Sequence, residues 1–216
     1  SMFFPTEKRV NKLQFSAYAA AALIHMLNRQ RDAAGLSLFD EQLQFHTRAR
    51  MNKNHVQTLY ARLDELLNLK YQPKQRKQTQ ISDVLHQIAE AAHKRSLVVV
   101  FSDMFENEDA SKLFKALEHL RYNKHEVIVF HVHDRQYEEA LVLEDRPHRL
   151  IDMENGEEMK LKPQEVRKLY STQMKSFYEQ VRKKCLQYKV DFVTADINEP
   201  FDKVLTSFLA RRSRMF

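Results

Sequence analysis

Uninterrupted apolar runs that stop at polar residues are the clearest pattern along this chain. Residues 97–101 read Leu-Val-Val-Val-Phe and are followed directly by Ser102 and Asp103. A run without polar alternation predicts a strand buried on both faces, as in the centre of a parallel sheet. Residues 126–132 and 190–195 have the same character, so the sequence predicts at least three strands of this kind.

Segments with apolar residues at helical spacing alternate with these strands. They predict helices from Asn11, from about residue 52 to 67, over 79–92, 109–122 and 163–188, and over 200–211. Either Thr79 or Ser82 could cap the third of these helices. Strand and helix in alternation predict right-handed crossovers and a doubly wound, mostly parallel α/β sheet in three Rossmann-like layers. We expect one domain over residues 1–216.

Two stretches break this alternation and predict antiparallel pairs. Residues 33–39 favour a buried strand that pairs with a shorter strand over 43–48. Asn155-Gly156 separates two short apolar stretches, and Asn-Gly is a strong signal for a hairpin turn. We therefore expect a β-hairpin inserted at about 148–162.

Composition agrees with a single globular core. The chain has 216 residues, of which 43% are hydrophobic and 30% charged, so it can bury a substantial core. No apolar run approaches the roughly 20 residues that span a bilayer, so we expect no membrane segment in this chain. The single cysteine, Cys185, excludes an internal disulfide and suits a cytoplasmic location.

The net charge of +6 raises the question of nucleic-acid binding. Basic residues are spread along the chain and interleaved with carboxylates, which dilutes any single positive field. An acidic partner protein or a phospholipid surface explains the charge as well as DNA does, and a solvated surface explains it best. A nucleic-acid partner is therefore the third choice among the functions that we weigh.

Candidate chemistry lies where the run 97–101 ends. In open α/β sheets ligands bind outside the carboxyl ends of the strands, so Ser102 and Asp103 fall where a small polar ligand or a cation would bind. The alternative is structural, because Asp103 could cap the helix that begins near Asp109 or shape the turn.

Several stretches along the chain carry a resemblance to a known family. They are Ser1-Met2, Lys12-Leu13 before an Ala-rich helix, residues 31–36, Thr79, residues 96–103, the hairpin residues 152–157, and residues 190–192 with 208–212. Together they resemble a bacterial family, the domain of unknown function 58. Members of that family are similar to von Willebrand factor A domains, which carry a metal-ion-dependent adhesion site at the strand ends. The resemblance also offers a MoxR-type AAA+ ATPase as a possible partner.

The resemblance implies a metal motif of the form Asp-x-Ser-x-Ser-Met, followed by a threonine and an aspartate. Here Ser1, Thr79 and Asp103 match its last serine, its threonine and its aspartate, and Ser102 lies beside them. The cofactor implied is Mg²⁺ or another divalent cation, since hydroxyls and carboxylates form a hard oxygen shell. The chain starts inside the motif, and Ser1 is either its native serine or a residue left by cloning. We therefore expect this chain to bind metal weakly or not at all.

These observations together predict a cytoplasmic, non-catalytic protein-interaction scaffold rather than an enzyme. The enzymatic alternative is a metal-dependent phosphoesterase that combines Asp103 with Asp32, Asp134 or Asp196. The sequence has no P-loop and no GxSxG motif, and its two glycines cannot form a Gly-rich phosphate loop.

Overall fold

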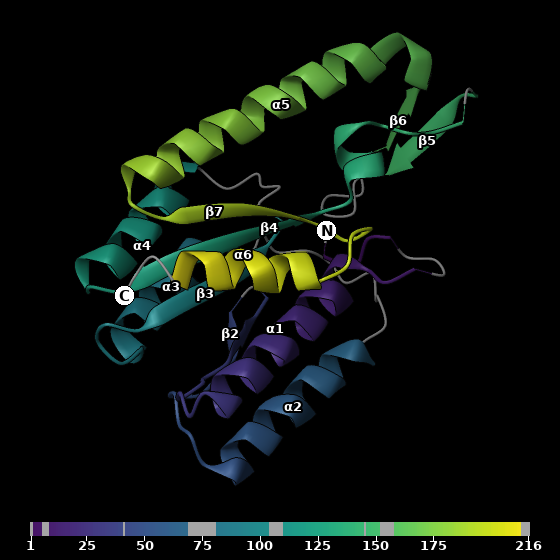
Figure 1. Cartoon of the computed structure of the whole chain (residues 1–216). Helices are drawn as coiled ribbons and strands as arrows, with labels where there is room; N and C mark the ends of the chain where they lie inside the picture. Colours follow the sequence, from purple (N-terminus) through teal and green to yellow (C-terminus); the bar gives the residue numbers. More distant parts are fainter. Residues whose placement is uncertain are drawn as a thin grey trace.

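A parallel sheet forms the centre of the fold, and helices lie on both of its faces (Figure 1). The computed structural model describes residues 2–5, 9–40, 42–68, 81–103, 110–144, 146–151 and 158–212. The elements in chain order are α1 (Lys12–Arg29), β1 (Ser37–Phe39), β2 (Leu43–His46), α2 (Lys53–Leu67), α3 (Ile81–Ala91), β3 (Leu97–Ser102), α4 (Ala110–Tyr122), β4 (Glu126–His133), the π-helical turn η1 (Arg135–Glu139), β5 (His148–Ile151), β6 (Glu158–Leu161), α5 (Pro163–Gln187), β7 (Asp191–Asp196) and α6 (Asp202–Arg212).

The sheet has the order β3-β4-β7, and both pairs of strands are parallel. β4 is the middle strand, and each of its residues after Glu126 is buried. The prediction that residues 97–101 form the central strand is wrong for the described strands, because β3 pairs with β4 alone and is largely half-buried. A long apolar run shows that both faces are covered by helices, but it does not say how many strand neighbours there are.

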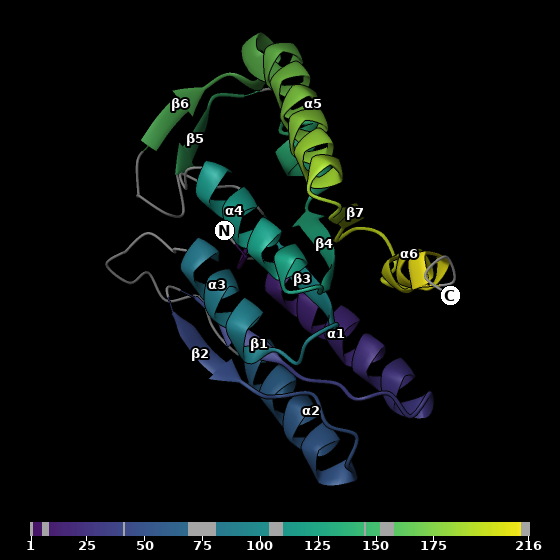
Figure 2. The same cartoon turned by 90° about the vertical axis from the view of Figure 1, so that its left-hand side faces the viewer.

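Alternate residues of β4 point to two different hydrophobic clusters. Val127 and Val129 pack with α3, α4 and the C-terminal half of α5, whereas Ile128, Phe130 and Val132 pack with α1 and α6. Figure 2 shows α3 and α4 beside each other, with α6 on another side of the sheet. The predicted mixed α/β architecture with a parallel sheet is confirmed.

Helix α1 joins the sheet to a further layer. One face of α1 packs on the sheet, and another packs on α2 through a third cluster that includes Ala17, Ile24 and Leu59. The Ala-rich sequence allows this close approach on two sides. Asn11 begins the helix with a capping box, in which its side chain accepts from Gln14 N while the Gln14 side chain accepts from Asn11 N. The first residue of α1 is therefore held in one position.

Both predicted hairpins are present. β1 pairs antiparallel with β2, although the first strand covers only Ser37–Phe39 of the expected 33–39. Ala34 forms an isolated bridge with Arg50, and between them Gly35 approaches the backbone of Thr47. β5 pairs antiparallel with β6 as expected, whereas the Asn155-Gly156 turn lies outside the described residues.

Candidate functional site

Each strand of the parallel sheet ends at an aspartate. Asp103 directly follows β3, Asp134 directly follows β4, and Asp196 is the last residue of β7. Because the strands are parallel, the three aspartates lie along one edge, which we call the carboxyl edge. Asp103 is 3% exposed and Asp134 is 0% exposed. Buried carboxylates need partners, since desolvation without compensation is costly.

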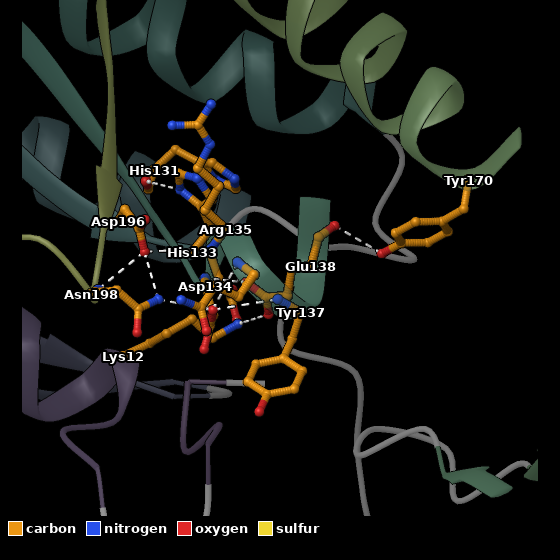
Figure 3. A network of polar contacts seen from close by, with 12 residues as sticks. Lys12, His131, His133, Asp134, Arg135, Tyr137, Glu138, Tyr170, Asp196 and Asn198 are labelled. Atoms are coloured by element: carbon orange, nitrogen blue, oxygen red, sulfur yellow. Dashed lines mark hydrogen bonds and ion pairs between the residues drawn. The ribbon is translucent and has the colours of Figure 1, made fainter. Parts of the chain in front are cut away.

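Lys12 supplies that partner for Asp103. The Lys12 side chain is fully buried, and its Nζ donates to Asp103 Oδ2 at 3.0 Å and to Glu138 Oε1 at 2.6 Å. Figure 3 shows the Lys12 side chain extended toward η1, which carries Glu138. Removing one member of a buried ion pair typically costs about 3–5 kcal/mol, because the remaining charge stays buried without a counter-charge.

Lys12 is also an unusual residue for its place in the helix. It is the first residue of α1, where the partial positive charge of the helix dipole disfavours a cation by about 0.3–1 kcal/mol. The two carboxylates offset this repulsion. The position of Lys12 alone does not point to a buried acidic partner, because Lys53 follows an Asn cap in the same way and is exposed.

Asp134 organises the turn that positions Glu138. Its Oδ1 accepts from Gln136 N at 3.0 Å and from Tyr137 N at 3.4 Å, which caps η1. Asp134 N in turn donates to Glu138 Oε2 at 2.8 Å (Figure 3). Glu138 therefore binds Lys12 with one oxygen and the backbone N–H of Asp134, the cap of η1, with the other.

Asn198 links the ends of β4 and β7. Its Nδ2 donates to Asp134 Oδ1 and to Asp196 Oδ1, each at 2.9 Å. Asp196 Oδ1 also accepts from Asn198 N at 3.0 Å. Asp134 Oδ2 is buried and has no hydrogen-bond partner among the residues that the structure describes. The carboxyl edge thus contains one buried oxygen that no described residue satisfies.

The segment before α1 closes the site on one side. Lys12 N donates to Phe4 O at 3.0 Å, and Leu13 N donates to Met2 O at 2.8 Å. The Phe4 ring meets the Tyr137 ring edge-on at 5.8 Å between centroids. These contacts hold the start of α1 against η1.

A second group of polar side chains lies on β4, on the face that carries Val127 and Val129. His131 and His133 stack at 5.2 Å between centroids, and the Tyr178 ring of α5 lies 5.0 Å from His131. Burial lowers the pKa of His131 to about 3, with smaller contributions from the charges of His133 and Lys12. Burial, followed by the charge of Glu138, raises the pKa of Tyr178. His131 is therefore neutral at physiological pH.

Helix α5 is tied to the same turn. Tyr170 Oη donates to Glu138 O at 2.9 Å, and Arg167 donates to Leu141 O and Leu143 O. Burial, followed by the charge of Glu138, raises the pKa of Tyr170, so this hydroxyl stays a donor. The turn η1 is thus held by α1, α5 and the loop after β7.

The predicted site residues are only partly brought together. Asp103 lies at the centre of the polar network. Ser102 instead lies on the face of β3 that packs against α3 and α4, where it lines a cavity of about 10 Å³. This cavity has room for about one water molecule. Ser1 and Thr79 lie outside the described residues. Ser82 is the second residue of α3 and not its cap. Of the three predicted metal ligands, Ser1, Thr79 and Asp103, the structure therefore describes the surroundings of Asp103 alone.

The described residues do not provide a metal-binding set. No group of three or more His, Cys, Asp or Glu side chains among them is arranged to hold a metal ion. Asp103 is instead paired with Lys12. Of the carboxylates in the phosphoesterase alternative, Asp134 and Asp196 lie at the carboxyl edge. Asp32 follows the other end of α1, an 18-residue helix about 27 Å long.

Fold and site define a mixed α/β domain with a polar network at the carboxyl edge of a parallel sheet. The chain belongs to the DUF58 family: the model of that family, described as "Protein of unknown function DUF58", matches residues 1–180. No curated protein matches the chain.

Two solved structures share the fold. The conserved hypothetical protein BatB from Bacteroides thetaiotaomicron has a TM-score of 0.55 and 12% identity, with 94% of this chain and 89% of BatB covered. An aerotolerance-related membrane protein from Bacteroides fragilis NCTC 9343, with multiple mutations to serines, has a TM-score of 0.52 and 13% identity, with 89% of each chain covered. In the described part of this chain, no helix has the length and apolar content to cross a membrane.

Proposed function

We propose that this chain is a non-catalytic protein-interaction domain, similar to von Willebrand factor A domains, that binds its partner through the carboxyl edge. The observation that carries the proposal is the buried network of Lys12, Asp103 and Glu138. It fixes the start of α1, the end of β3 and the turn η1 against one another. A surface built on such fixed segments loses little conformational freedom on binding.

The roles of the carboxylates also favour binding over hydrolysis. Asp103 pairs with an ammonium, while Asp134 and Asp196 accept hydrogen bonds from backbone N–H groups of the loops that follow their strands. A phosphoesterase would instead use these oxygens to hold metal ions and activate water. Metal-dependent turnover of a phosphoester that is lost in Asp103→Asn would replace this proposal with the enzymatic one.

The partner that we propose is a MoxR-type AAA+ ATPase, and the complex would assemble or mature other proteins in the cytoplasm. This choice rests on the family resemblance. The fully buried thiol of Cys185, whose pKa burial raises to about 12, suits a reducing compartment but does not require one. The magnesium site with Ser1 and Thr79 stays a prediction, because both residues lie outside the described part of the chain.

The test compares two charge reversals of the same kind. Arg135 is exposed on η1 at the carboxyl edge and pairs with Glu139, whereas Arg62 is exposed on α2 and pairs with Glu65. We expect Arg135→Glu to weaken binding of a purified MoxR-type ATPase, measured by surface plasmon resonance, on the order of tenfold. Arg62→Glu should leave the affinity within about twofold.

Three results would count against the proposal. Equal affinities for the wild type and Arg135→Glu would remove the carboxyl edge from the interface. Absence of binding by the wild type would remove the ATPase as the partner. Tight, steeply salt-dependent DNA binding would instead favour the nucleic-acid alternative.

A further inference from the structure

We infer that the Lys12 ammonium is the resident cation of the carboxyl edge and that, in this chain, it occupies the place at Asp103 where a divalent metal ion would bind. The inference deepens the proposed function and rests on it for the role of the site. It can nevertheless be tested without any partner.

The geometry is that of a cation site with an ammonium at its centre. Lys12 Nζ lies 3.0 Å from Asp103 Oδ2 and 2.6 Å from Glu138 Oε1, and all three side chains are largely buried. Asp134 adjoins the same site, because its N–H binds Glu138, and its buried Oδ2 has no partner among the described residues. Carboxylate oxygens of this kind are the ligands of Mg²⁺, Mn²⁺ and Ca²⁺.

An ammonium and a divalent ion cannot share Asp103. Two cations a few ångströms apart in a buried site repel each other strongly, so a metal ion could bind only after Lys12 leaves. Lys12 is tethered at the site by the capping box of α1 and by the backbone contacts of residues 2–5. A metal ion from solution must therefore compete with a cation that is always present.

This arrangement predicts what the site becomes without Lys12. Two buried carboxylates, Asp103 and Glu138, would lose their counter-charge, and Asp134 Oδ2 would still have no partner among the described residues. No three acidic side chains among the described residues are arranged to hold a metal ion, but the pair of Asp103 and Glu138, with water as further ligands, should bind a hard divalent cation. It should also accept a small primary ammonium ion that replaces the head of the missing side chain.

The test uses Lys12→Ala with Lys53→Ala as its matched control. Lys53 is the first residue of α2 and follows an Asn cap, just as Lys12 does in α1, but it is exposed. We expect Lys12→Ala to lower the melting temperature on the order of 10 °C, and Lys53→Ala to change it by about a degree at most. Millimolar Mg²⁺ or Mn²⁺, or butylammonium, should restore much of the loss in Lys12→Ala only.

The wild-type chain provides a measurement that does not depend on how the variant folds. Isothermal titration with Mg²⁺ and Mn²⁺ should show no site with sub-millimolar affinity, and EDTA should leave the melting temperature unchanged. Binding by Lys12→Ala that disappears in Lys12→Ala/Asp103→Asn would support the inference.

Two results would overturn it. One is tight divalent binding by the wild type that is lost in Asp103→Asn. The other is a folded Lys12→Ala variant that responds to neither metal nor butylammonium. Metal binding and melting temperature are measured without the ATPase. If the ATPase does not bind, these two measurements still test the inference about Lys12. If the inference about Lys12 fails, the measured affinity for the ATPase still tests the proposed function.

Discussion

Acid should destabilise this protein through His131, and replacing that residue should remove the effect. His131 is 1% exposed on the middle strand of the sheet. Its ring packs against His133, against Tyr178 of α5 and against Phe192 of β7, with centroids 5.0–5.8 Å apart. Phenylalanine is close in size and shape to histidine and suits this stack of rings. His131→Phe therefore removes the titration while keeping most of the packing.

The size of the effect follows from the pKa of His131. Burial first, then the charges of His133 and Lys12, lower this pKa from 6.5 to about 3 in the folded protein. The unfolded chain therefore binds a proton at pH values where the folded protein does not. Stability should be fully present above pH 6.5 and fall as the pH drops toward 3. Between pH 7.5 and 5 the loss is about 2 kcal/mol, at 1.36 kcal/mol for each pH unit below 6.5.

Urea unfolding at a series of pH values measures this loss. The difference in unfolding free energy between wild type and His131→Phe should change by about 2 kcal/mol from pH 7.5 to 5. His93→Phe makes the same replacement at an exposed histidine, and its pH profile is the one with which that of His131→Phe is compared. Parallel pH profiles for the wild type and His131→Phe would refute the reasoning.

Two further predictions concern the packing. Phe130→Ala empties a fully buried position in the cluster that packs on α1 and α6, and it should cost about 3–5 kcal/mol in urea unfolding. Tyr122→Ala, at a site that is 84% exposed, should cost under about 0.5 kcal/mol. Similar costs for both substitutions would contradict the assigned core. Gly35→Ala would place Cβ 2.7 Å from Thr47 O, a backbone atom, so we expect a loss of about 1–3 kcal/mol by the same assay, and unchanged stability would argue against this close approach.

The elements of the fold could be predicted from local patterns, but the order of the strands could not. The run 97–101 indicated burial on both faces, and its residues do pack against helices on both sides. Whether β3 or β4 is central depends on strand neighbours far apart in the sequence. The buried strand was expected over 126–132, including His131, and its burial in fact continues to His133, since a histidine at the end of an apolar run does not look like a core residue.

The ion pairs at the centre of the site could not be predicted either, again because they join residues far apart in the sequence. Asp103 could be proposed because strand ends are where α/β sheets bind ligands. Its partner Lys12 lies 91 positions away, and Glu138 lies 126 positions from Lys12. No local spacing connects such residues. The unfavourable position of Lys12 at the start of a helix does not reveal them either, because Lys53 begins α2 in the same way and is exposed.

Hydrogen exchange on the complex with a purified MoxR-type ATPase tests the central claim most directly. If the carboxyl edge is the binding surface, amides in residues 134–138 and 197–201 should exchange more slowly in the complex, and those of α2 should be unchanged. Protection confined to α2, or to the exposed face of α5, would contradict the assignment of the carboxyl edge as the interface.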